Sequence, residues 1–204
     1  MTRSQWSSPG RPGRVGERGF TLVELGTVVV IIGILATLAV YGMNRYVQYT
    51  KTAEAAEMIG AIKSGEEDYY GETFRYLSSD PTTAVGQTSP FYPDSPANAD
   101  GSIKIQWGGT NVCANCLTGF RILGVMPAAP VLFRYSVTAG RPGMNPAVLV
   151  PPEASEAHFT GVGVASSEFY VVFAMSDLDG NGPPYTTYSA SSFTSELRAV
   201  NVGQ

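Results

Sequence analysis

The sequence contains a single histidine, His158, and only two cysteines among its 204 residues. The sequence therefore has too few histidines for a histidine-rich metal centre, and a serine–histidine–acid triad could use only His158. No serine stands in a Gly-x-Ser-x-Gly setting, and no glycine-rich loop of the phosphate-binding type is present. These absences argue against an enzyme.

Positive charge is also scarce outside the amino-terminal end. Residues 1–19 contain four arginines and one glutamate, whereas the rest of the chain has nine basic and sixteen acidic residues. This acidic body has no basic stripe, so nucleic acid is not expected as a partner. A basic end before an apolar span and an acidic body obeys the positive-inside rule for membrane proteins.

The main feature that is present is an apolar run from Phe20 to Tyr41, in which Glu24 is the one side chain charged at neutral pH. As a helix this run would extend about 33 Å, close to the thickness of a hydrocarbon core. A buried soluble helix would show a polar stripe, which this run lacks. Three outcomes fit: a plain transmembrane anchor, a secretory signal cleaved after the run near Ala39, or cleavage before the run.

The stretch RGFTLVEL, residues 18–25, favours cleavage before the run. It resembles the class III signal of type IV prepilins and pseudopilins, and the following VVIIGILATLAV is similar to the helix of that family. The resemblance implies that prepilin peptidase cuts between Gly19 and Phe20, that Phe20 becomes N-methylated, and that Glu24 is the fifth mature residue. It also implies an assembly role, in which Glu24 meets the terminal amine of a neighbouring subunit. The positive end of the helix dipole favours an acid at this position.

The remainder of the chain predicts an α+β fold. Residues 42–75 read as an amphipathic continuation of the helix, although Glu66 interrupts the apolar face formed by Val47, Ala55, Ile59, Ile62, Tyr69 and Phe74. Residues 78–101 are predicted to be a loop. Short β-type runs follow at 103–107, 120–125, 131–137, 159–165, 169–175 and 185–189.

We therefore expect a long amino-terminal helix, membrane-spanning in its first half, packed against an antiparallel sheet. The family resemblance implies the same lollipop-like fold. The predicted parts are a leader at 1–19 that is removed on processing, a transmembrane or filament-core helix at 20–41, its amphipathic continuation at 42–75, and a β-rich globular domain at 76–204.

Cys113 and Cys116 form the pair CANC. Haem attachment would need histidine at position 117, which is leucine, and a four-thiolate zinc site would need a second cysteine pair. A thioredoxin-type redox pair should open a helix after a strand, whereas this pair is predicted to lie in a loop before a strand. In an exported domain, a short-loop disulfide is the favoured interpretation.

The stretch SDLDGNG, residues 176–182, resembles the start of a calcium-binding loop. Asp177, Asp179, Asn181 and Gly182 match positions one, three, five and six of an EF-hand loop. Tyr188 stands where a bidentate glutamate is required, so a polar turn is favoured over a calcium site. No other cofactor is expected.

The leading functional hypothesis is a structural subunit, major or minor, of a type IV pilus-like filament used in adhesion or motility. Its expected partners are prepilin peptidase, other pilin subunits and the inner membrane. The precursor would lie in the inner membrane, and the mature chain in a cell-surface or periplasmic filament. The alternatives are a pseudopilin of a type II secretion system and an exported, membrane-anchored binding protein.

Overall fold

The structure is a computed structural model that describes residues 19–93, 103–109, 113–154, 159, 162–178, 182–183 and 185–201. The chain divides into two compact units, Met1–Met43 and Asn44–Gln204. Helix α1 (Leu22–Thr73) provides the described helical residues of the first unit and the first element of the second. Among its described residues, the second unit also contains a short helix α2 (Cys116–Ile122) and four strands, which confirms the predicted α+β class.

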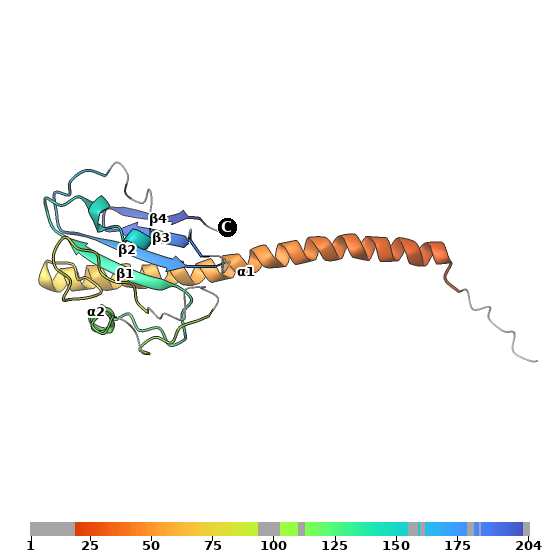
Figure 1. Cartoon of the computed structure of the whole chain (residues 1–204), viewed down its shortest axis with the longest axis horizontal. Coiled ribbons are helices and arrows are strands. Elements are labelled where there is room, and N and C mark those ends of the chain that lie inside the picture. The colour runs from red at the N-terminus through yellow and green to blue at the C-terminus, as the bar shows by residue number, and fades with distance from the viewer. Residues whose placement is uncertain are drawn as a thin grey trace, which may run out of the picture. The chain divides into compact units, whose positions relative to one another are not determined.

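The strands form one antiparallel sheet in chain order, as Figure 1 shows. They are β1 (Arg134–Gly140), β2 (Phe169–Ser176), β3 (Thr186–Ser191) and β4 (Thr194–Val200). Between β1 and β2 lie two 3₁₀ helices, η2 (Pro146–Leu149) and η3 (Pro152–Ala154). Strand β2 is buried along its whole length, so both faces of the sheet are covered there.

Alternate residues of β2 enter two separate apolar clusters, as the two-residue period of a strand requires. Tyr170, Val172 and Ala174 pack in the larger cluster with residues of α1 and α2. On the opposite face, the cluster members are Phe91, Leu149, Ala154, Phe159, Phe169, Val171, Phe173 and Met175. The sheet is therefore a central layer, with helices on one side and the 3₁₀ segment on the other.

The amphipathic face of α1 matches the prediction only in its middle. Ala55, Ile59 and Ile62 are buried against the sheet, as expected. Val47 and Phe74 were predicted on the same face, and they are 41% and 73% exposed, so those two assignments were wrong. The buried face is shorter than the predicted stripe because the buried side chains of α1 lie only between Ala55 and Glu66.

Several strand predictions were also wrong. Residues 120–125 begin in helix α2, because Cys116, Phe120 and Leu123 follow the helical period and all three enter the core. Residues 103–107 contribute only an isolated bridge from Ile105 to Val131, and the described part of 159–165 contains no strand. Strands β2 and β3 were predicted within two residues, whereas β1 begins three residues late and β4 was missed.

Glu66 is fully buried on the face of α1 that packs in the core. Its Oε2 accepts a hydrogen bond of 3.0 Å from the backbone N–H of Leu77, which ties the helix to the chain beyond its end. Its Oε1 has no hydrogen-bond partner within the described part of the chain. Burial, with a smaller contribution from the neighbouring charge of Glu67, raises the pKa of Glu66 from 4.5 to about 8.

Two glycines allow backbone segments to approach closely. A Cβ atom at Gly65 of α1 would collide with the carbonyl group of Leu123, which follows α2. A Cβ at Gly119 of α2 would collide with the carbonyl group of Ser79. Helix α2 is therefore held against both α1 and the 78–79 segment by contacts that only glycine permits.

Substitution Gly65→Ala is expected to lower the free energy of unfolding by about 1–3 kcal/mol, because the added methyl group has no room. The matched control is Gly60→Ala on the same helix, where nothing lies within 4 Å of the new Cβ. That change should raise the free energy of unfolding by up to about 1 kcal/mol through helix propensity. Thermal unfolding of the full chain in detergent micelles, followed by circular dichroism, measures both. Equal effects of the two substitutions would contradict the close contact.

The buried Glu66 predicts a pH dependence of stability. Its pKa in the folded chain is raised to about 8 from 4.5, so folding takes up a proton between these values. Its contribution to the free energy of unfolding should be greatest below pH 4.5 and decline as the pH rises through about 8. Substitution Glu66→Gln should remove this decline and make the chain more stable than wild type at pH 8. Parallel pH profiles for wild type and the variant would show the expectation to be wrong, and Glu67→Gln serves as the control.

Candidate functional site: the amino-terminal segment

The start of helix α1 is closed by a reciprocal pair of side chains, Thr21 and Glu24. Glu24 Oε2 accepts hydrogen bonds from the Thr21 backbone N–H at 2.9 Å and from the Thr21 hydroxyl at 2.8 Å. The Thr21 Oγ1 in turn accepts the Glu24 backbone N–H at 3.2 Å. This is a capping box, in which the residue before the helix and its third residue satisfy each other's free donors.

For Glu24 the sequence predicted an interaction with the helix dipole and with a partner subunit, and the local cap was missed. The signal was present, because TLVE matches the pattern of serine or threonine followed three residues later by glutamate. The carboxylate therefore has two partners within its own chain before any subunit approaches. This arrangement lets an acid lie at the edge of an apolar helix without being left unpaired.

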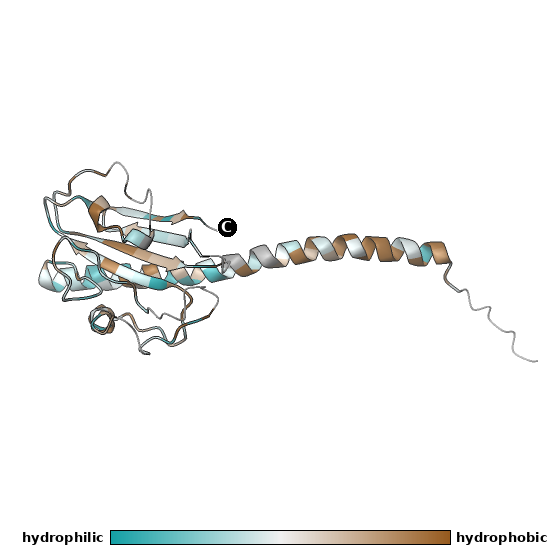
Figure 2. Cartoon of the chain, in the orientation of Figure 1, coloured by the Kyte–Doolittle hydropathy of each residue, from teal (hydrophilic) through white to brown (hydrophobic). Residues whose placement is uncertain are grey.

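The helix that follows is apolar on every side. By length and composition, Leu22–Met43 could cross a membrane, and none of its hydrophobic window is buried within the chain. Figure 2 shows this half of α1 as the longest continuous hydrophobic stretch of helix. Leu22 is 88% exposed and Leu38 is 64% exposed, so no part of the described chain covers them. A surface of this size requires lipid or other protein around it.

Gly19 and Phe20 lie just outside the helix, and both are exposed. A Cβ atom at Gly19 would meet nothing within 4 Å, and its backbone is not among those with a positive φ. The fold therefore gives no steric reason for glycine at this position. Any requirement for a small residue must come from a molecule that acts on this segment.

Cys113 and Cys116 are joined by a disulfide, with their Cα atoms 5.5 Å apart. Contrary to the prediction, Cys116 opens a helix, α2, and residues 110–112 lie outside the described residues. Asp80 Oδ2 lies 3.9 Å from the Cys113 sulfur, while its Oδ1 accepts from both the backbone and the hydroxyl of Thr82. The two sulfurs are bonded to each other, so this cluster does not form a metal site in the disulfide state.

The predicted calcium loop is described only in part. Asp177 is buried, and its Oδ2 accepts a hydrogen bond of 2.8 Å from the Gly182 backbone N–H, which closes the loop as a turn. Gly182 has a φ of +83°, consistent with the glycine expected at this point. Asp179 and Asn181 lie outside the described residues, as does His158. Calcium binding at this loop stays a prediction.

No model of a known protein family matches the chain, and no solved structure shows a significant match. Among curated proteins, the chain is similar to fimbrial protein EcpC of Eikenella corrodens, with 39% identity over 56 residues, 28% of this chain and 37% of the relative. It is also similar to type IV major pilin protein PilA of Myxococcus xanthus, with 39% identity over 59 residues, 29% of this chain and 27% of the relative.

A third relative is type II secretion system core protein G of Pectobacterium carotovorum, with 32% identity over 90 residues. That alignment covers 43% of this chain and 58% of the relative. The chain thus spans between 27% and 58% of the length of these three relatives. Their names agree with the motif around Gly19, Phe20 and Glu24, and over the aligned residues the chain is similar to type IV pilins and to a pseudopilin-type secretion protein.

Proposed function

We propose that the mature chain is a structural, non-enzymatic subunit of a type IV pilus-like filament. The observation that carries this proposal is the apolar helix Leu22–Met43, which is uncovered in the chain and headed by a capped acid. Lipid would cover this surface in the precursor, and the same helices of sister subunits would cover it in the filament. Relatives that are named as pilins and fimbrial proteins support this assignment.

The finer steps follow from the motif at the amino terminus. Prepilin peptidase would cut between Gly19 and Phe20 while the precursor lies in the inner membrane, and Phe20 would then be N-methylated. The absence of any steric demand on Gly19 within the fold supports a role for this residue in recognition by the peptidase. The mature chain would enter a filament at the cell surface or in the periplasm.

Cleavage would create a positive amine at Phe20, one residue before the cap. The Glu24 carboxylate is held by Thr21 at the start of the helix, and this residue is exposed. A neighbouring subunit's amine could then approach an oxygen that is already oriented. Local capping in the precursor and an intersubunit ion pair in the filament are compatible uses of the same side chain.

A pseudopilin of a type II secretion system is the second candidate. The observation that supports it is the similarity to the secretion protein named above, which extends over 90 residues. Both candidates require the same processing and the same helix packing. They differ in whether the filament extends from the cell surface or remains in the periplasm, which electron microscopy of sheared and unsheared cells distinguishes.

Substitution Gly19→Leu is expected to block processing, whereas Gly19→Ala should largely preserve it, because the peptidase site would accept only a small residue. The measurement is the intact mass of the chain purified from membranes. Wild type should begin at Phe20 and carry one additional methyl group. A chain that begins near Val40 would instead indicate a secreted binding protein, and normal shortening of the Gly19→Leu chain would contradict the processing assignment.

Substitutions at Glu24 separate its two roles. Glutamine can retain the capping bond but carries no charge, whereas valine loses both. If the charge pairs with a neighbouring amine, Glu24→Gln and Glu24→Val should both remain in the membrane and both enter filaments about tenfold less, since hydrogen bonds to charged groups contribute about 1.5–3 kcal/mol. Filament entry is measured as the ratio of sheared to membrane-bound subunit. Wild-type entry by the glutamine variant would show that the cap alone is required.

A further inference from the structure

Phe74 is an exposed aromatic residue in a backbone conformation that seldom suits it. It follows the last residue of α1, with a φ of +56°, and its side chain is 73% exposed. The position directly after a helix commonly adopts this left-handed conformation, and glycine is the usual residue there. A bulky apolar side chain at this position gains little from burial within its own chain, so its presence calls for a partner.

The surroundings of Phe74 hold it in place. Its backbone N–H donates a hydrogen bond of 2.8 Å to the carbonyl oxygen of Tyr70. Its ring meets the ring of Tyr70 edge-on at 6.3 Å, and Tyr70 stacks on Tyr76 at 4.6 Å. The Thr73 hydroxyl also bonds the carbonyl oxygen of Arg75. A side chain that is fixed before binding loses little conformational entropy on association.

The same unit carries an apolar groove that could receive such a ring. It lies between α1 and residues 124–131, and its volume is about 470 Å³, within the range of sites that hold small ligands. Its apolar wall includes Met58, Ala61, Val125, Met126, Ala128 and Pro130. Met126 is 49% exposed, so apolar surface remains open to solvent at this groove.

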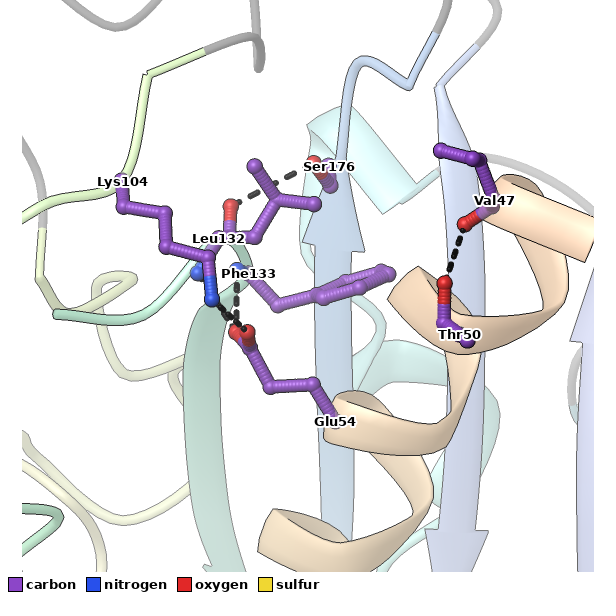
Figure 3. Close-up of polar contacts among 7 residues, drawn as sticks. All are labelled: Val47, Thr50, Glu54, Lys104, Leu132, Phe133 and Ser176. Carbon is purple, nitrogen blue, oxygen red and sulfur yellow. Dashed lines mark hydrogen bonds and ion pairs between the residues drawn. The ribbon is translucent and has the colours of Figure 1, made fainter. Parts of the chain in front are cut away.

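One wall of the groove is fixed by Glu54 (Figure 3). The Glu54 carboxylate forms an ion pair of 3.2 Å with Lys104 and accepts the backbone N–H groups of Leu132 and Phe133. The Leu132 carbonyl oxygen accepts the Ser176 hydroxyl of β2 at 3.3 Å. These bonds join α1, residue 104 and the chain before β1, so the groove is formed before any partner arrives.

Charge around the two features is complementary. Arg75 lies next to Phe74, and Glu57 lines the groove; both side chains are exposed. Within the described part of the chain, neither belongs to an ion pair. The other carboxylate of the groove, Glu54, is already matched by Lys104. Glu57 is thus the groove charge left for an incoming cation.

We propose that Phe74 of one copy inserts into the 124–131 groove of a second copy, with Arg75 facing Glu57. The contact rests on the proposed filament function and names one of the surfaces that would hold the globular units together. The Phe74 ring and the 124–131 groove are different surfaces of the same chain, so the contact is heterologous, and such a contact builds an open helical array when its rotation does not close into a ring. Along α1, Phe74 lies about 20–25 Å beyond Ala61 and Glu57, so the two copies would be displaced lengthwise.

The first test is Phe74→Gly in the full chain, expressed in its native cells. Glycine suits the positive φ, so the melting temperature in micelles should be unchanged or up to about 2–4 °C higher. Sheared filaments should nevertheless fall about tenfold or more, as for a residue that anchors an interface. The matched control is Val148→Ser, an exposed apolar residue of η2 that should leave filaments unchanged. A residue with a purely structural role would not separate stability from assembly in this way.

The second test is a charge exchange. Arg75→Glu alone and Glu57→Arg alone should each reduce filament number, and the double variant should recover it, because the pair is restored with reversed sign. The contact would be overturned if wild type forms filaments and Phe74→Gly assembles normally, or if the double variant does not recover. Either result would leave the filament function standing. Absence of any filament or pseudopilus from wild-type cells would overturn the proposed function itself.

Discussion

Leu22–Met43 exposes apolar side chains around its whole circumference. Because hydrating that surface costs free energy, this segment requires a lipid or protein environment. At about 25 cal/mol per Å² of apolar area, a helix of this length cannot stay uncovered in water. The cover must come from outside the chain, because no described residue is packed against it. Lipid and identical helices are both suitable covers, and a subunit that moves from one to the other keeps the surface dry throughout.

The acid at the start of that helix fits the same constraint. A carboxylate deep in the apolar run would be costly, whereas at the first turn Thr21 supplies two donors to Glu24. The Thr21 hydroxyl also accepts one of the free N–H groups that every helix start presents, that of Glu24. The Thr21–Glu24 pair therefore supports the acid at the helix start within the chain itself. In the filament proposed above, the same carboxylate would also meet the amine of a neighbouring subunit.

The sequence predicts the features of this chain that depend on strong local patterns. The apolar run, the helix to Thr73 and strands β2 and β3 follow from hydropathy, periodicity and β-branched or aromatic composition. Helix α2 was missed, because CLTGFRI contains the residue types of a strand, and the helical spacing of Cys116, Phe120 and Leu123 is recognised only once their packing in the core is known. Strand β4 was not predicted because its residues are mostly polar and nearly all exposed, so its sequence shows no alternation of apolar and polar residues.

Side-chain roles at the candidate site show the same division. TLVE contains the capping box in plain form, so the Thr21–Glu24 bond can be read from four residues. The burial of Glu66 cannot be predicted from the local sequence, because its hydrogen-bond partner is the backbone of Leu77, eleven residues away and beyond the helix end. The exposure of Phe74 likewise depends on where the sheet stops covering α1. The Thr21–Glu24 cap can therefore be predicted from a local pattern, whereas the burial of Glu66 and the exposure of Phe74 are seen only in the folded chain.

Three acids on helix α1 show how environment decides the role of one residue type. Glu24 is held by its own N-cap at the edge of an apolar span, and Glu54 joins a lysine and two backbone N–H groups beside a groove. Glu66 lies in the core with a single backbone donor, and burial raises its pKa to about 8. Glu24 accepts two hydrogen-bond donors and Glu54 accepts three, whereas the fully buried Glu66 accepts one, so burial costs the charged form of Glu66 most. Glu24 and Glu54 therefore fix the helix start and one wall of the groove, whereas Glu66 stabilises the fold best when it is neutral.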